Sequence, residues 1–203
     1  MKTLVIIDAQ NDFMPGGALA VPNGDPIVPL INQLQEKFDL VIATQDWHPE
    51  KHASFASSHK GSEEFEVKNL DGIDQVMWPD HCIQNTNGAN FHVDLKTSKI
   101  EAIFRKGTDI KIDSYSGFYD NTRLKSTGLT GYLKEKDASE LYFVGLAAEY
   151  CVYFSILDAL SEGFQVTLLE DGTKALKEEA FQKARIDILS KGGSVINSEE
   201  LKF

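Results

Sequence analysis

The chain has 203 residues, of which 42% are hydrophobic and 25% are charged, and its formal net charge is −11. This length and composition are typical of a soluble globular protein, so we predict a single domain over residues 1–203. The acidic balance argues against nucleic acid or an anionic membrane as the main partner, because both bind basic surfaces. A homo-oligomer of this chain is compatible with the sequence.

Targeting and redox features predict a cytoplasmic protein. The apolar stretch at the N-terminus is too short for a signal peptide, and Asp8 follows it directly. No segment approaches the apolar length that a membrane span needs. The two cysteines, Cys82 and Cys151, lie far apart without CxxC spacing, so neither a disulfide framework nor a four-cysteine zinc site is expected.

Short apolar runs alternate with helical patterns along the chain. The apolar runs predict strands at residues 2–8, 40–44, 101–107, 140–144, 164–169 and 193–196. The helical patterns cover residues 27–37, 124–136, 150–162 and 178–190. Strands that alternate with helices predict an α/β fold with three layers, α/β/α, around a mainly parallel sheet of about six strands.

Residues 45–98 form a long polar region with many turn residues and scattered aromatic residues. A loop region of this length inside a compact domain is usually functional or disordered. It holds all five histidines of the chain, which favours a function for it.

Several reactive side chains follow predicted strands. In an open α/β sheet, ligands bind outside the carboxyl ends of the strands, so Asp8, Asp46, Lys106 and the 145–151 turn are expected to converge. Cys151 follows a strand-to-helix turn, where helix N-terminal amides lower the pKa of a thiol. Asp8 could then act as general base, with Lys106 favouring the thiolate. The alternatives are a cysteine that is simply buried, an acid that caps a helix and a solvated lysine.

A second group of residues has metal-ligand chemistry. Asp46 and His48 are two residues apart in an extended segment, which points both side chains to the same side. His81 is the candidate third ligand, and such a set leaves coordination positions open for water or substrate. The alternative is that these histidines are surface loop residues without a metal.

Aromatic residues lie in loops beside both groups: Phe13, Trp47, Trp78 and Tyr115. Loop aromatics are commonly ordinary packing residues, but they can also sandwich a flat ring. A flat aromatic substrate would explain their position.

Five segments in this order resemble the nicotinamidase (pyrazinamidase) family of the isochorismatase-like cysteine hydrolase superfamily. They are Asp8–Phe13, Asp46–Pro49, Trp78–Cys82, Tyr115–Phe118 and Gly145–Val152, with Lys106 between the third and the fourth. The resemblance spans nearly the whole chain. One departure lies beside Cys151, where the family usually has Thr or Leu followed by Asp and this chain has Ala148 and Glu149.

The resemblance implies roles for individual residues. It implies a catalytic triad of Asp8, Lys106 and Cys151. It implies one divalent metal ion, zinc first with iron or manganese as the other candidates, held by Asp46, His48 and His81. It also implies an oxyanion hole from the backbone N–H groups of Ala147 and Cys151, with a cis peptide between Leu146 and Ala147. Phe13, Trp78 and Tyr115 match ring-packing positions, and His52 is assigned to a supporting role in the loop.

The reaction that the resemblance implies is hydrolysis of nicotinamide to nicotinic acid and ammonia, a step of NAD salvage, through a cysteine thioester. One alternative is another amide or carbamoyl cysteine hydrolase of the same fold. An isochorismatase proper fits less well, because its chemistry does not need the cysteine. A non-enzymatic flavodoxin-like binding module is the remaining alternative. The absence of a Gly-x-Gly-x-x-Gly or Walker A sequence after the first strand counts against it.

Overall fold

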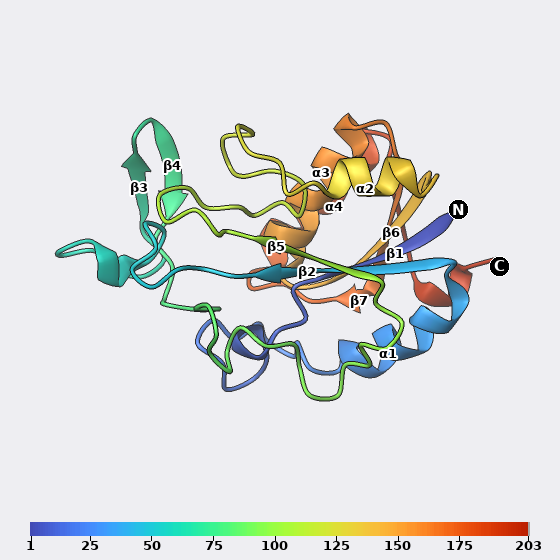
Figure 1. The fold of residues 1–203 in the computed structure, drawn as a ribbon, viewed down its shortest axis with the longest axis horizontal. Coiled ribbons are helices and arrows are strands. Elements are labelled where there is room, and N and C mark those ends of the chain that lie inside the picture. Colours follow the sequence, from blue (N-terminus) through green and yellow to red (C-terminus); the bar gives the residue numbers. More distant parts are fainter. Residues whose placement is uncertain (203) are drawn as a thin grey trace.

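The computed structural model describes residues 1–202 and is built around a parallel sheet of six strands (Figure 1). The strand order is β5-β2-β1-β6-β7-β8, and every neighbouring pair is parallel. The six strands are β1 (Lys2–Ile7), β2 (Leu40–Asp46), β5 (Ala102–Lys106), β6 (Glu140–Gly145), β7 (Gln165–Thr173) and β8 (Ser194–Ile196). The predicted parallel sheet is confirmed.

Helices cover both faces of this sheet. They are α1 (Ile27–Leu34), α2 (Leu129–Glu135), α3 (Tyr153–Ser161) and α4 (Glu178–Ser190). Figure 1 shows α1 on one side of the sheet and the other three helices on the opposite side. Because side chains alternate along a strand, Leu4 of β1 packs in the same cluster as Ile31 of α1, whereas Val5 packs with Ile156 of α3. The three-layer α/β/α prediction is therefore confirmed.

Helix α2 is shorter than its predicted range, which began at Leu124. In the structure the helix begins at Leu129, after Gly128 with φ of +90°. The preceding residues form a turn around Asp120, whose carboxylate accepts hydrogen bonds from the backbone N–H groups of Thr122, Leu124 and Lys125. A carboxylate that bonds nearby amides in this way competes with helix formation.

The region at 45–98 contains a small antiparallel hairpin that the sequence prediction missed. Its strands are β3 (Val67–Leu70) and β4 (Ile73–Val76), and they pair with each other. The linking residues Asp71 and Gly72 have φ of +51° and +94°. Asp-Gly is a strong hairpin signal because both positions of such a turn need positive φ. The signal was present, but each flanking strand is only four residues long and half polar.

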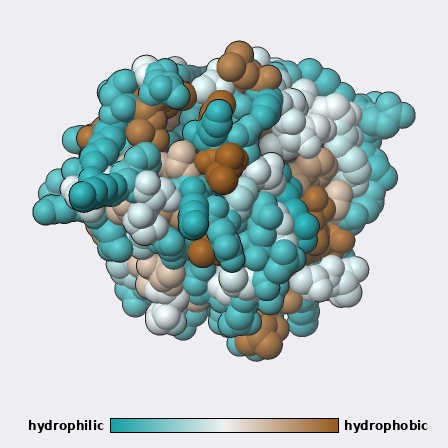
Figure 2. All heavy atoms as spheres, turned by 60° about the vertical axis from the view of Figure 1, so that its left-hand side comes forward, coloured by the Kyte–Doolittle hydropathy of each residue, from teal (hydrophilic) through white to brown (hydrophobic). Residues whose placement is uncertain are grey.

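The surface is consistent with the acidic, polar composition. Figure 2 shows one face on which hydrophilic residues dominate and hydrophobic residues form small separate groups. Within residues 1–202, no helix has the length and apolar character needed to cross a bilayer.

Candidate active site

The side chains at four strand ends meet on one edge of the sheet. Asp8 follows β1, Asp46 is the last residue of β2, and Lys106 is the last residue of β5. Asp46 and Lys106 are partners in the β2–β5 register. Cys151 lies in the turn after β6, and all four residues are buried. The structure therefore brings together the residues that the strand-end argument selected.

Gly145 allows the nucleophile turn to approach β1. Its φ is +114°, and a Cβ atom at this position would lie 1.9 Å from the carbonyl oxygen of Ile7. The next residue, Leu146, donates its N–H to that same oxygen at 2.9 Å. Only glycine tolerates both the conformation and the close contact, so Gly145 is what allows the turn to lie beside Asp8.

Lys106 is the centre of the group. Its Nζ lies 2.6 Å from Asp46 Oδ1, 2.9 Å from Asp8 Oδ2 and 3.3 Å from Cys151 Sγ. It also donates to the carbonyl oxygen of Ser114 at 3.0 Å. Carboxylate oxygens of Asp8 and Asp46 and the Cys151 sulfur all lie within 4.8 Å of one another. One buried ammonium group thus contacts both acids and the thiol.

The thiol itself is not acidified, contrary to the prediction from its place at a helix start. Burial raises the pKa of Cys151 well above its usual range; Lys106 opposes this effect, and Asp8 and Asp46 add to it. Burial and the two nearby carboxylates thus act against the lowering expected from a helix start. A nearby base that takes the thiol proton would therefore assist Cys151 as a nucleophile.

Asp8 is suited to be that base. Burial raises the pKa of Asp8, while the charge of Lys106 acts in the opposite direction. Thr44 Oγ1 donates a hydrogen bond of 2.7 Å to Asp8 Oδ1, which leaves Oδ2 on the side of Lys106. A carboxyl group with a raised pKa can accept a proton and return it near neutral pH.

The turn that carries Cys151 begins with a cis peptide between Leu146 and Ala147, as the resemblance implied. A π-helical turn, Ala148–Val152, follows and leads into α3. Residues 150–152 were predicted as α-helix, so this prediction was wrong in geometry. No hydrogen bond within residues 1–202 uses the Ala147 amide as donor. That amide is therefore available to a substrate oxygen near Cys151.

Asp46, His48 and His81 form a compact group of potential metal ligands. Their donor atoms lie within 4.8 Å of one another, and all three side chains are buried. Asp46 Oδ2 lies 3.5 Å from His48 Nε2 and 3.7 Å from His81 Nε2. Burial would raise the pKa of Asp46, but the charges of Lys106 and His48 outweigh it and hold that pKa well below its usual range. The acid is thus ionised, as a metal ligand must be.

Both histidine rings are oriented by backbone carbonyls. His48 Nδ1 lies 3.0 Å from the oxygen of Gly107, and His81 Nδ1 lies 2.8 Å from the oxygen of Pro79. A ring nitrogen that faces a carbonyl oxygen carries a proton, so in each histidine Nε2, which faces Asp46, is the nitrogen that can bind a metal ion. Two imidazole nitrogens and one carboxylate are a common set for a catalytic divalent cation. The residues present therefore fit such an ion.

The remaining histidines lie around this group or away from it. The His52 ring packs on the His48 ring with a centroid distance of 4.5 Å, and its Nδ1 lies 2.8 Å from Ser54 Oγ. Donor atoms of His48, His52 and Asp113 also lie within 4.8 Å of one another. His59 bonds the backbone oxygen of Ala53. His52 thus packs beside the ligand group, as its predicted supporting role requires.

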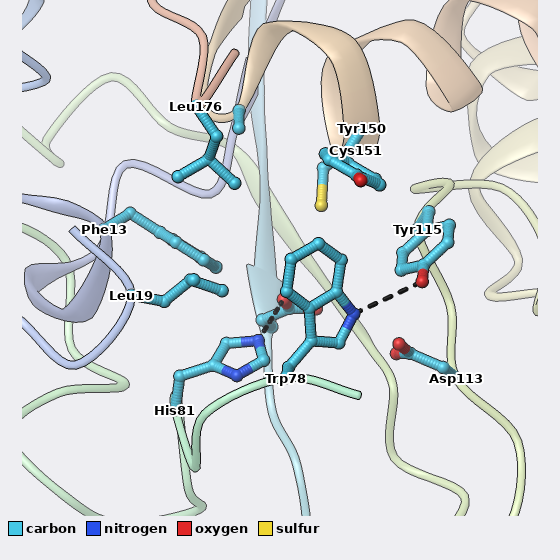
Figure 3. Close-up of a pocket in the computed structure, with 11 residues that line it drawn as sticks. Phe13, Leu19, Trp78, His81, Asp113, Tyr115, Tyr150, Cys151 and Leu176 are labelled. Carbon is cyan, nitrogen blue, oxygen red and sulfur yellow. Dashed lines mark hydrogen bonds and ion pairs between the residues drawn. The ribbon is translucent and has the colours of Figure 1, made fainter. Parts of the chain in front are cut away.

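A pocket opens onto Cys151 and the ligand group (Figure 3). Phe13, Trp78 and Tyr115 line it, as the sequence predicted. Trp78 Nε1 donates to the Tyr115 hydroxyl at 3.2 Å, which fixes these two walls relative to each other. Trp47 is not among the lining residues: its ring packs under the guanidinium of Arg105 at 3.7 Å.

Four lining residues were absent from the predicted site: Leu19, Asp113, Tyr150 and Leu176. Tyr150 directly precedes Cys151, and Asp113 begins the aromatic loop of Tyr115. Both could therefore have been predicted as pocket residues from their position in the sequence. Tyr150 meets Trp78 edge to face with a centroid distance of 4.9 Å. Leu176 follows β7 without any motif, and only the fold brings it to the pocket.

Comparison with known proteins identifies the family. The model of the isochorismatase domain matches residues 2–200. The chain belongs to the isochorismatase family.

Similar members of this isochorismatase family are nicotinamidases. The chain is 46% identical to a nicotinamidase of Escherichia coli (strain K12) over 179 residues, 86% of this chain and 84% of that protein. The structure of an Acinetobacter baumanii nicotinamidase and pyrazinamidase superposes with a TM-score of 0.96 at 44% identity, covering 99% and 98% of the two chains. A pyrazinamidase of Pyrococcus horikoshii in complex with zinc gives a TM-score of 0.80 at 38% identity, covering 97% and 98%.

Proposed function

We propose that this chain is an amidohydrolase that converts nicotinamide to nicotinic acid and ammonia through a thioester on Cys151. The observation that carries the proposal is the buried group of Cys151, Lys106 and Asp8, in which Cys151 lines an aromatic pocket. The similar nicotinamidases support the choice of substrate.

In the first half of the reaction, Asp8 takes the proton of the Cys151 thiol and the sulfur attacks the carboxamide carbon. Lys106, 3.3 Å from the sulfur, stabilises the thiolate as it forms. The backbone N–H groups of Ala147 and Cys151 bind the oxygen that becomes negative. Asp8 then returns the proton to the departing nitrogen, so the C–N bond breaks and ammonia leaves.

In the second half, water hydrolyses the thioester. Asp8 is again the base and removes a proton from water as its oxygen attacks the carbonyl carbon. The C–S bond breaks, and the sulfur regains its proton from Asp8. Nicotinic acid is the product, and each group returns to its starting state.

Asp46, His48 and His81 are the residues that would hold one divalent ion, and we propose zinc for it. When bound, the ion supplies a positive centre that can fix the pyridine nitrogen of the substrate. Phe13, Trp78 and Tyr115 would enclose the ring, so that the carboxamide faces Cys151. The zinc complex of the Pyrococcus horikoshii pyrazinamidase supports the choice of metal.

The test is ammonia release from nicotinamide, with pyrazinamide as a second substrate, by protein whose metal content has been analysed. We expect turnover by the unmodified chain and none by Cys151→Ala, although this variant should still bind metal and nicotinamide. Wild-type ammonia release by Cys151→Ala would overturn the role of the cysteine. Turnover of other amides but not of nicotinamide would favour a different cysteine hydrolase. Ligand binding without any turnover would favour a binding module.

A further inference from the structure

Glu149 lies in the turn that carries Cys151, but its side chain contacts the segment after β7. The residue is only 6% exposed. Its carboxylate accepts the Lys177 N–H at 2.7 Å and the Leu176 N–H at 3.2 Å. The preceding residue, Ala148, donates its own N–H to the oxygen of Lys174 at 2.8 Å. Three hydrogen bonds therefore connect the nucleophile turn to residues 174–177.

This connected segment contributes to two parts of the structure. Lys177 immediately precedes α4, and no side-chain hydrogen bond of its own caps that helix. Glu149 accepts from the N–H groups of Leu176 and Lys177, so it holds the backbone just before the first turn of α4. Leu176 lines the substrate pocket, where it lies on the same side as Phe13 (Figure 3). Since Glu149 holds the Leu176 amide, a shift of residues 174–177 would move Leu176 relative to Cys151.

We propose that Glu149 is a positioning residue that holds Leu176 at the pocket and so sets how tightly the substrate ring is bound beside Cys151. The inference rests on the proposed function. The Glu149 carboxylate forms its hydrogen bonds with the Leu176 and Lys177 amides and not with Lys106 or the Cys151 sulfur. Loss of this carboxylate should therefore weaken substrate binding more than it slows the chemical step.

The geometry explains why a glutamate is needed here. Its two oxygens each accept from one backbone N–H. A glutamine keeps the shape but replaces one acceptor with an NH₂ donor, which cannot pair with an N–H group. An aspartate keeps both acceptors but is one methylene shorter, so it reaches both amides only if residues 174–177 move.

The experiment is a double-mutant cycle on the KM and kcat for nicotinamide with Glu149→Gln and Leu176→Ala. Each single substitution should raise KM about fivefold to tenfold, because a lost contact in an apolar pocket is worth roughly that much, while kcat stays within about twofold. If Glu149 acts through Leu176, the double variant should have the KM of Leu176→Ala alone. Glu179→Gln, the same change at an exposed position of α4, should leave KM unchanged.

Two results would overturn the inference in an active enzyme. One is a double variant whose fold increase in KM equals the product of the increases in the two single variants. The other is a fall in kcat at unchanged KM for Glu149→Gln. If Glu149→Gln does not fold, the same cycle with Glu149→Asp decides between these outcomes. If the wild-type chain releases no ammonia from nicotinamide, the proposed function itself is overturned. This result can be told apart from the two above, because it is obtained with the wild-type chain before any variant is measured.

Discussion

At the scale of single residues, Lys106 connects the catalytic group to the metal-ligand group. It contacts Asp8 and Cys151 on one side and Asp46, a proposed metal ligand, on the other. Burial alone would lower the pKa of this lysine, but the charges of Asp46 and Asp8 outweigh it and hold the pKa well above its usual range. Lys106 is therefore charged at neutral pH, and it is the cation that both acids contact.

Replacement of Lys106 by methionine should therefore cost both activity and stability. The change leaves two buried carboxylates without their cation, which should lower the free energy of unfolding by about 3 kcal/mol. The measurement is urea denaturation of metal-free protein. Lys134→Met is the control, since Lys134 pairs with Glu162 and is 56% exposed. It should change the free energy of unfolding by less than about 1 kcal/mol. Equal losses for the two variants would contradict the central place of Lys106.

At the scale of elements, the ends of β2 and β5 place the potential metal ligands. Gly107 follows β5, with φ of +62°, and its carbonyl oxygen is bonded to His48 Nδ1. A Cβ atom on Gly107 would lie 2.4 Å from His48 Cε1. The glycine thus allows the chain to pass directly against the ring that it orients.

Gly107→Ala should displace the His48 ring and so weaken zinc binding about tenfold or more. Loss of a group that orients a ligand histidine typically lowers metal affinity by at least this factor. Gly61→Ala is the matched control: Gly61 also has positive φ, +78°, but a Cβ atom there meets nothing within 4 Å. Both variants carry the same backbone penalty, so only the contact with His48 differs. Competition with a chelator measures the affinities. Unchanged affinity in Gly107→Ala would show that His48 is not a ligand.

The elements also show how far the sequence could predict the structure. Apolar runs identified all six strands of the main sheet, and the pattern at Glu178–Ser190 gave α4 with its observed bounds. The start of α2 was missed because the Asp120 side chain organises a turn where residue propensities favour helix. The rule that residues at the carboxyl ends of parallel strands converge predicted the contact of Asp8, Asp46 and Lys106. It could not find Leu176, which reaches the pocket only through tertiary contacts.

At the scale of the whole molecule, the parallel sheet assembles the site from segments that are far apart in the chain. Asp8 follows β1 and Cys151 follows β6, the fourth strand of the sheet in chain order. These two strands are nevertheless adjacent and paired in the sheet. The two proposed ligand histidines, His48 and His81, lie in loops outside the sheet. A metal ion bound by Asp46 and His81 would therefore connect the end of β2 to the loop that carries His81.

Metal binding should accordingly stabilise the whole protein. Free zinc at about 100 times its dissociation constant should add about 2.7 kcal/mol to the free energy of unfolding, because it binds only the folded chain. Thermal unfolding with zinc and with a chelator measures this difference. His81→Ala should abolish the difference, whereas His92→Ala, at a position outside the ligand group, should retain it. A zinc effect that persists in His81→Ala would place the ion elsewhere.

The central claim is that Cys151 forms a covalent intermediate, and trapping it is the most direct test. The enzyme is mixed with nicotinamide, quenched in acid during turnover and digested, and the peptides are analysed by mass spectrometry. The account predicts a nicotinoyl group on the peptide that contains Cys151. The peptide that contains Cys82, the other buried free cysteine, should be unmodified. Full turnover with no acyl group on Cys151, or an acyl group on Cys82 instead, would contradict the account.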